Sequence, residues 1–529
     1  MSHAKVAVSI HRASDGSGTR TDAPDGRRWI PYSRNSVAFA AALVSVLALA
    51  LYLRTMLPST GFWDTGEAQT VPPTLSIFHP TGFPFYSLLG WAWSQLPIGE
   101  VAWRMNLLSA GCVALAAGLV TLIAGHLVVE RHRWLAGSAV AVAGLAFAFA
   151  SEPWQNGTRA DVHAINVLFV ALVVWLLLAW GAAERAGGPR AGRWLAAAAA
   201  AFGLGLATHP LSGLAAFGIA VWLLVVDPAI WRRWRLVLGS AVLIGLGIAL
   251  YGTIYLRAVI EPAPPLFYAH PNTWENFRYL VFAEQFRGLF EEFGSPLADL
   301  GRKWVGAERV LAAQLSGPGW LLVAMGAAVT ATRRPGVVAF LGLVAVATTL
   351  YAVNFRDGDI DRYYLPVLVV TIPFLGVAVA AIGAAAASAL AEIGRRMVAS
   401  RAARHRLANL AGAIVVALGA AVPIASLVTG YEANDQSANR EADAWVASVH
   451  AQLPPNAVVI SWWSYSTPLW YHRWVLGERP DVTIVDERNI LDDGYRTMHN
   501  AIRTFLGERP VYVVPPHWEW ADLAREWSF

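Results

Sequence analysis

The sequence has little of what keeps a soluble protein in water. Only 14% of its 529 residues are charged and 56% are hydrophobic, whereas a soluble domain averages about a quarter charged residues. The single cysteine, Cys112, excludes a disulfide framework and a thiol metal site. The sequence also lacks a glycine-rich phosphate fingerprint and any HxxxH or HxH pair, so neither a nucleotide-binding loop nor a dedicated zinc site is indicated. This composition is typical of a multi-span membrane protein.

Aromatic residues are abundant instead. The chain contains 24 tryptophans and 15 tyrosines, whose amphipathic rings settle at the boundary between membrane and water. Its pI is about 9.2 and its mean hydropathy is +0.45. The basic residues lie in short connections between apolar runs, which is a signature of membrane topology. We therefore expect a membrane lipid partner and no nucleic-acid partner.

Apolar runs recur along the chain and predict a mainly α, polytopic transmembrane helical bundle. A span requires about 20 apolar residues. The first run is too long for a cleaved signal peptide, so it is kept as the first span. This criterion gives about eleven predicted spans, at residues 37–57, 105–129, 134–151, 164–183, 194–209, 211–227, 236–256, 316–332, 336–353, 364–387 and 407–428.

The runs 194–209 and 211–227 are short, and only Thr208-His209-Pro210 separates them. The two runs could therefore form either one buried hairpin or one broken helix. Cytoplasmic loops are enriched in lysine and arginine, and arginine clusters stand on both sides of the pair, so the chain is predicted to cross the membrane twice. The clusters are Arg185, Arg190 and Arg193 before the pair, and Arg232, Arg233 and Arg235 after it.

The same rule orders the whole chain. The arginine-rich N-terminus and all the basic connections fall on one side, predicted to be cytoplasmic, and an odd number of spans places the C-terminus outside. We expect a multi-pass membrane protein with a cytoplasmic N-terminus and an extracytoplasmic C-terminus. The predicted domains are a disordered cytoplasmic tail (1–34), a transmembrane module (35–430) and an extracytoplasmic domain (431–529).

The last hundred residues have the pattern of a small α/β domain. Short β-branched runs at 457–460, 482–485 and 511–514 are separated by helical stretches near 467–476 and 494–506. This alternation predicts a small, mainly parallel sheet.

Ionisable residues gather near span ends on the predicted outer side, where such groups are functional-site candidates by default. Asp64 and Glu67 are three residues apart and would share one face of a helix. They could form a capping box. Alternatively, they act as a general base toward an acceptor hydroxyl, or hold a divalent cation such as Mg²⁺ or Mn²⁺.

Further candidates come from other outer connections. The guanidinium groups of Arg257 and Arg362 could bind phosphate oxygens through two parallel N–H donors. The alternative for both is that the side chain extends along the membrane interface to reach water. The alternative for His163 and His209 is a packed, hydrogen-bonded role, and the alternative for His79 is a surface histidine in a simple re-entry turn. The candidates for substrate binding are His79, Asp161, His163, His209, Arg257, Arg362 and Tyr363.

Several motifs carry a resemblance to a known family. They are Asp64-Thr65-Gly66-Glu67, the stretch from Leu75 to Pro84 (LSIFHPTGFP), Arg104 to Ala110 (RMNLLSA), Ala160 to Ala164 (ADVHA), and Arg362 to Pro366 (RYYLP). They resemble the GT-C superfamily of membrane glycosyltransferases. The similar branch is a bacterial one related to transmembrane protein O-mannosyltransferases.

The resemblance implies a sugar donor linked to a polyprenyl phosphate and an acceptor that is a protein, a lipid or a glycan. It implies that Asp64 is the general base and that Glu67 positions the acceptor or a metal. Asp161 and His163 would complete the cavity, while Arg257 and Arg362 would hold the phosphate. One displacement at the anomeric carbon would invert the stereochemistry.

Two other classes of protein remain open. A secondary transporter would concentrate its polar groups near the bilayer midplane between inverted repeats, but here they lie at span ends and no repeat symmetry is present. A non-catalytic membrane sensor with an outer ligand-binding domain is the second alternative.

Overall fold

A computed structural model describes residues 34–130, 132–289, 297–315, 318–356, 358–397, 400–490, 492–516 and 519–527. The tail predicted to be disordered, at 1–34, lies outside these residues except for Arg34, where the first helix begins.

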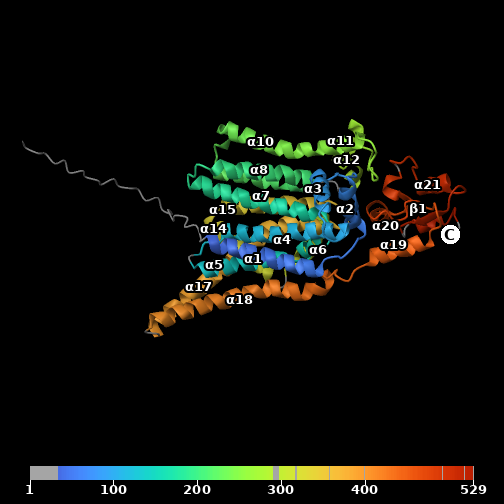
Figure 1. Cartoon of the computed structure of the whole chain (residues 1–529). Coiled ribbons are helices and arrows are strands. Elements are labelled where there is room, and N and C mark those ends of the chain that lie inside the picture. The colour runs from blue at the N-terminus through green and yellow to red at the C-terminus, as the bar shows by residue number, and fades with distance from the viewer. Residues whose placement is uncertain are drawn as a thin grey trace, which may run out of the picture.

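Most of the helices lie side by side and form one bundle (Figure 1). They are α1 (Arg34–Thr55), α4 (Val101–Leu127), α5 (Arg133–Ala148), α7 (Val162–Arg185), α8 (Ala191–Thr208), α9 (Ala216–Val226), α10 (Trp234–Ile248), α11 (Gly252–Val259), α14 (Gly319–Arg333), α15 (Pro335–Asn354), α16 (Leu365–Thr371), α17 (Pro373–Met397) and α18 (Arg401–Asn434).

Shorter helices connect them. They are α2 (Trp63–Thr74), α3 (Pro84–Ser94), α6 (Ser151–Thr158), α12 (Trp274–Val281) and α13 (Leu297–Gln314), with the 3₁₀ turns η1 (Pro210–Ala215) and η5 (Ile360–Tyr364). The buried residues of the bundle, chiefly alanine, valine and leucine, form one continuous core.

Seven of the described helices are long and apolar enough to cross a membrane, or up to nine if two bent pairs each count as one span. The predicted number of about eleven spans is larger than this count, which is made by helix length and composition alone. The difference lies in the runs 194–209 and 211–227. They form α8 and then η1 with α9, and the second is a shorter apolar helix because Pro210 starts it as a tight 3₁₀ turn.

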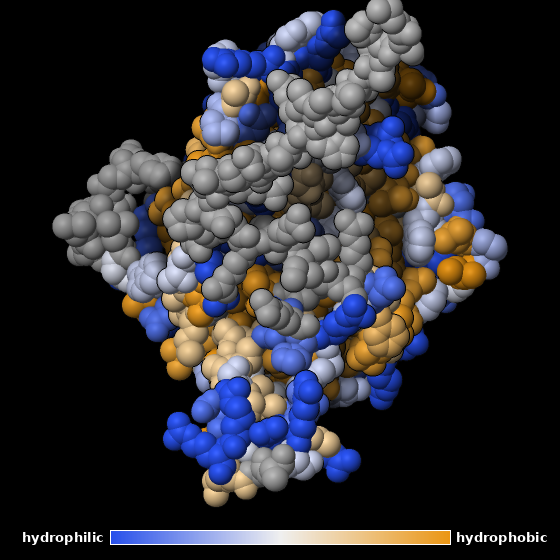
Figure 2. Space-filling model, turned by 90° about the vertical axis from the view of Figure 1, so that its left-hand side faces the viewer, coloured by the Kyte–Doolittle hydropathy of each residue, from blue (hydrophilic) through white to orange (hydrophobic). Residues whose placement is uncertain are grey.

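The two passes predicted for this pair agree with the contacts at its ends. Arg233, after α9, makes an ion pair of 2.7 Å with Glu184, before α8. The chain therefore leaves and returns to the same end of the bundle. The Arg334 guanidinium donates to the carbonyl of His126 at 2.7 Å, which brings two more connections with arginines together. We call this the basic end. Figure 2 looks at it, and hydrophilic patches alternate there with hydrophobic surface.

The C-terminal region forms a three-stranded parallel sheet in the order β2-β1-β3, as the sequence predicted. The strands are β1 (Val458–Ser461), β2 (Thr483–Asp486) and β3 (Val511–Val514), with α19 (Glu441–Gln452), α20 (Trp463–Trp470) and α21 (Met498–Phe505) around them.

This region sits on the end of the bundle opposite the basic end (Figure 1). Helix α20 packs on α2, and the amide of Ala102 donates to the hydroxyl of Tyr471 at 2.9 Å. We call the junction between α2 and α20 the site end.

Candidate active site

A buried amide network holds α2 in place at the site end. The Gln69 amide group donates to the Asn106 side-chain oxygen at 2.9 Å and accepts from the Thr60 hydroxyl at 3.0 Å. Both amide side chains are fully buried, and a buried polar group must be hydrogen-bonded to be tolerated. The network therefore fixes α2, and with it the two carboxylates of its first turns, against α4.

Glu67 is bound to the loop that follows α2. Its Oε2 lies 2.5 Å from Nδ1 of His79, and its Oε1 accepts from the His79 backbone amide at 2.9 Å. The capping-box alternative is not formed, because Phe62 is the N-cap residue and no side chain caps the helix. Glu67 is fully buried, so it orients the imidazole and leaves His79 Nε2 facing Asp64, 4.0 Å from Oδ1.

Arg362 joins two carboxylates from distant parts of the chain. Its Nη2 lies 2.5 Å from Oδ2 of Asp64, and its Nη1 lies 3.2 Å from Oδ2 of Asp161. The other oxygen of Asp161 accepts from the amide of His163 at 2.7 Å and thereby caps α7. The structure thus brings together α2, the start of α7 and the turn η5, as the sequence predicted for a shared site.

Accessibility separates the three carboxylates. The Glu67 and Asp161 side chains are 0% and 1% exposed, while Asp64 is 20% exposed. Asp64 is therefore the carboxylate of this cluster that an outside molecule can reach. Burial raises the pKa of Asp64, but the Arg362 guanidinium and His79 outweigh it and hold that pKa well below its usual range. Asp64 is ionised at neutral pH.

His79 lies between two carboxylates. Burial disfavours its imidazolium, but the Glu67 and Asp64 carboxylates outweigh burial and raise the pKa of His79.

His163, His209 and Tyr363 form an aromatic wall beside the carboxylates. The His163 ring lies 4.6 Å from the His209 ring and 5.1 Å from the Tyr363 ring, and Phe83 stacks on His209 at 5.3 Å. His209 Nδ1 accepts from the amide of Leu211 and so starts η1. His163 Nδ1 is buried and has no hydrogen-bond partner among the described residues.

Arg257 is not brought into this cluster. Its Nε donates to the carbonyl of Leu75 at 2.9 Å, and its Nη1 donates to the carbonyls of Ile260 and Pro262. Its guanidinium therefore ties the end of α11 to the loop after α2.

Two residues of the site end were not found from the sequence. The guanidinium of Arg488 lies 3.8 Å from the ring centroid of Trp463, and the Trp463 ring in turn contacts the rings of His79 (5.8 Å) and Trp63 (6.1 Å). Trp463 follows β1 and Arg488 follows β2. A signal was present, because open parallel sheets bind ligands at the carboxyl ends of their strands.

Asp64, Glu67 and His79 also form a candidate cation site, since each offers a ligand atom and these atoms lie within 4.8 Å of one another. Both oxygens of Glu67 contact His79, and Oδ2 of Asp64 contacts Arg362. The remaining donors are Asp64 Oδ1 and His79 Nε2. A carboxylate with an imidazole fits Mn²⁺ better than Mg²⁺, which prefers oxygen alone.

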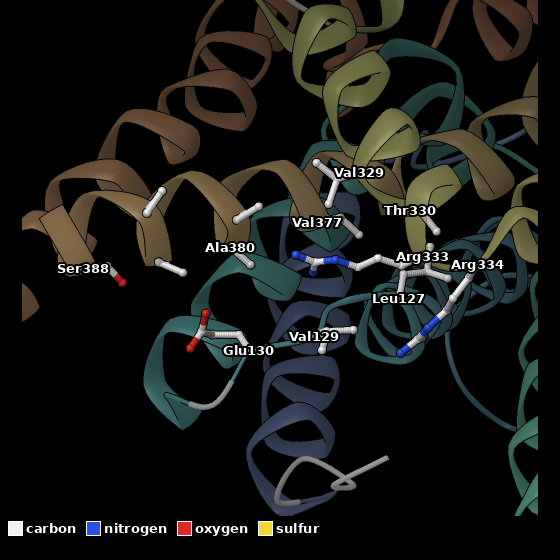
Figure 3. A pocket seen from close by; sticks show the side chains of 13 residues that line it. Leu127, Val129, Glu130, Val329, Thr330, Arg333, Arg334, Val377, Ala380 and Ser388 are labelled. Carbon is white, nitrogen blue, oxygen red and sulfur yellow. The ribbon is translucent and has the colours of Figure 1, made fainter. Parts of the chain in front are cut away.

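A separate pocket of about 320 Å³ opens at the basic end and is lined by none of these residues. It lies between the end of α14, the connection after α4, and one face of α17. Figure 3 shows the Arg333 side chain extending into it, with Glu130 on another wall. Seven of its thirteen lining residues are alanine or valine, and its charged residues are Glu130, Arg333 and Arg334.

Known structures of similar shape define the class of fold. The apo structure of ArnT from Cupriavidus metallidurans matches with a TM-score of 0.54 and 16% identity, over 92% of this chain and 95% of that chain. The structure of ArnT bound to undecaprenyl phosphate matches with a TM-score of 0.52 and 17% identity, over 94% and 96%. The chain has the fold of the GT-C membrane glycosyltransferases, and the predicted fold is confirmed.

Sequence similarity is more local. Residues 64–234 match the family described as the protein O-mannosyl-transferase TMEM260 N-terminal domain. Mouse TMEM260 is 35% identical over 147 residues, and the Dictyostelium discoideum protein is 25% identical over 146 residues. Each match covers 27% of this chain but only 19% and 17% of the relatives. The chain therefore spans less than a fifth of the length of the curated relatives that it matches. The predicted resemblance to O-mannosyltransferases is confirmed for this segment.

Proposed function

We propose that this chain is a membrane glycosyltransferase with Asp64 as its general base. It takes a sugar from a polyprenyl-phosphate donor and transfers it to a hydroxyl of a protein, lipid or glycan acceptor. We further propose that the site end faces the extracytoplasmic side of a bacterial inner membrane, because the opposite end carries the arginine-rich connections.

The observation that carries this proposal is the convergence of Asp64, Asp161 and Arg362 from three distant parts of the chain. Buried charges are costly, and a cluster of them at the end of a transmembrane bundle points to a reaction site. The fold gives independent support, since ArnT has the same architecture and was solved bound to undecaprenyl phosphate.

The proposed reaction is a single displacement. The acceptor oxygen forms a bond to the anomeric carbon while the bond from that carbon to the phosphate oxygen breaks. The electron pair leaves with the phosphate, and the acceptor proton moves to the Asp64 carboxylate. Attack from the face opposite the phosphate inverts the anomeric configuration.

The neighbours of Asp64 prepare it for this role. Arg362 holds one carboxylate oxygen and leaves the other for the acceptor, while Asp161 fixes the other end of the guanidinium. His79 is oriented by Glu67, which is too buried to touch a substrate and therefore acts as a positioning residue.

The decisive experiment compares Asp64→Asn with Asp522→Asn, an exposed carboxylate of the C-terminal region. Purified proteins in lipid are given labelled polyprenyl-phosphate sugars. General-base catalysis raises the reaction rate about 10²- to 10⁴-fold. The turnover of D64N should therefore fall by that factor while the protein inserts normally, and D522N should have the turnover of the wild type. Full activity in D64N would overturn the assignment, and retained stereochemistry in the product would overturn the single displacement.

As an alternative to the general-base role, we propose that Asp64 Oδ1 holds a divalent cation together with Nε2 of a neutral His79. Such an ion would neutralise phosphate charge. After chelation, Mn²⁺ should restore more activity than Mg²⁺, and His79→Gln should weaken Mn²⁺ binding measured by calorimetry. Equal response to both ions, or unchanged Mn²⁺ binding in H79Q, would contradict this assignment.

A further inference from the structure

The cationic side chains at the site end differ in whether a carboxylate pairs with them directly. Arg362 is paired with Asp64 and Asp161, and His79 is paired with Glu67. Arg488 makes no ion pair with any described carboxylate. Its guanidinium lies on the face of Trp463, beside the Tyr268 hydroxyl, and acts on Asp64, Glu67 and Asp486 only at longer range. No direct ion pair therefore blocks an incoming anion.

The position of Arg488 is set by the sheet of the C-terminal region. It lies two residues after Asp486, the last residue of β2, and Trp463 lies two residues after Ser461, the last residue of β1. These strands are neighbours in register, with Ser461 opposite Asp486. The parallel pairing therefore brings the arginine and the tryptophan together at one edge of the sheet, and this edge faces His79 and Trp63.

A purely structural role for Arg488 would be to neutralise the nearby Asp486. Asp486 is buried, its Oδ2 has no hydrogen-bond partner among the described residues, and its Oδ1 accepts from the Ser466 hydroxyl at 3.1 Å. Burial raises the pKa of Asp486 well above its usual value. No ion pair joins Arg488 to Asp486 among the described residues, so direct neutralisation of Asp486 is not the contact that holds the guanidinium.

The stacking geometry suits anion binding. A guanidinium that lies on an aromatic face uses its π-surface for that contact and keeps the N–H donors at its edge free for a ligand. Those donors match phosphate oxygens bidentately. Arg488 also acts on the cluster electrostatically, since it helps to lower the pKa of Asp64.

We propose that Arg488, stacked on Trp463, is the residue of the C-terminal region that binds the phosphate of the lipid-linked donor. This inference rests on the proposed function. Arg488 takes the phosphate-binding role that the sequence predicted for Arg257, whose guanidinium donates to backbone carbonyls instead. The C-terminal region thereby becomes part of the substrate site, and the donor is held between two regions of the chain.

The test measures binding without turnover. Radiolabelled undecaprenyl phosphate and, separately, inorganic phosphate are titrated against the full chain in lipid nanodiscs. The variants are Arg488→Ala, Arg488→Lys and the control Arg503→Ala, which removes an exposed arginine of the same region that is paired with Glu526. Removing one charge-assisted hydrogen bond to a ligand weakens its binding about ten- to hundredfold, so R488A should show this weakening and R503A none.

Each outcome is decisive. Wild-type affinity in R488A overturns the inference but leaves the proposed function standing, whereas failure of the wild type to bind undecaprenyl phosphate overturns both. If inorganic phosphate binds as tightly as the lipid, the site takes a free anion and the lipid assignment is wrong. If R488A does not fold, R488K keeps the charge but loses the planar fork, and it should still bind severalfold more weakly.

Discussion

Charged residues lie at both ends of the bundle, but they are used in opposite ways. At the basic end, Arg395 pairs with Glu392 three residues away, and their side chains are 64% and 49% exposed. At the site end, Arg362 is 11% exposed and pairs with Asp161, 201 residues away in sequence and 1% exposed. The first pair is local in sequence and exposed to solvent, whereas the second is long-range and buried.

The difference separates the charges that set topology from the charges of the candidate site. Exposed arginines cost little and orient the spans relative to the membrane. Buried charges carry a desolvation penalty that only good pairing offsets, so a chain that keeps them must use them. The pocket at the basic end (Figure 3) belongs to the first kind of surface and the Asp64 cluster to the second.

The largest contrast is expected from removing one arginine at each end. Arg362→Gln removes the guanidinium from the buried Asp161 and the partly buried Asp64 and should cost about 3–5 kcal/mol of unfolding free energy. Arg395→Gln breaks an exposed pair and should cost about 0–1 kcal/mol. Denaturant titration of both variants in detergent measures the difference.

A second variant checks the cause. Asp161→Asn added to R362Q removes one of the unpaired charges and should recover part of the lost stability. The comparison between the two ends breaks down if R362Q is as stable as R395Q, or if D161N worsens R362Q.

A smaller effect is expected from adding one methyl group. A Cβ at Gly66 would lie 2.5 Å from the carbonyl oxygen of Gly61 and 2.8 Å from the hydroxyl of Thr467 on α20. Gly66→Ala should therefore displace α2 from α20, cost about 1–3 kcal/mol and reduce turnover.

The matched control is Gly342→Ala in the middle of α15, where nothing lies within 4 Å of the added atom. This variant should be neutral or more stable by up to about 1 kcal/mol through helix propensity. Equal activity in the two alanine variants would show that the α2–α20 contact does not position the site.

The smallest effect is a pH dependence in the C-terminal region. Burial lowers the pKa of His472, but Asp443 and Glu478 outweigh it and raise that pKa above 6.5. When the pKa of a histidine is higher in the folded state, the histidine stabilises the fold fully at pH values below its pKa in the unfolded chain. This stabilisation is lost as the pH rises through its pKa in the folded protein. The unfolding temperature should therefore fall above about pH 6.5, and His472→Gln should flatten this slope. His405→Gln, an exposed histidine of α18 near the basic end, should leave the slope unchanged.

Much of the fold was readable from the sequence because it depends on local patterns. Apolar runs of sufficient length become helices, and β-branched runs such as 482–485 become strands, wherever the chain places them. The form of the run 211–227 was not readable, because the length and apolar character of a run do not show that Pro210 begins it with a 3₁₀ turn.

The site was predicted in part. Asp64, Glu67 and His79 lie within one short stretch, and the positive-inside pattern put Asp161 and Arg362 on the same side of the membrane. Which arginine meets which carboxylate was not readable. Arg257 and Arg362 look alike in sequence, yet only Arg362 reaches the cluster, while Arg257 binds carbonyls of its own neighbourhood.

The sequence by itself determined that the chain is a helical membrane bundle with its charged candidates at one end, because hydrophobic length and arginine bias act locally along the chain. Only the tertiary structure decided that Asp64 is the accessible carboxylate and that the C-terminal region contributes Arg488. The physical reason is that burial and ion pairing depend on which segments pack together, and that is set by contacts between residues hundreds of positions apart.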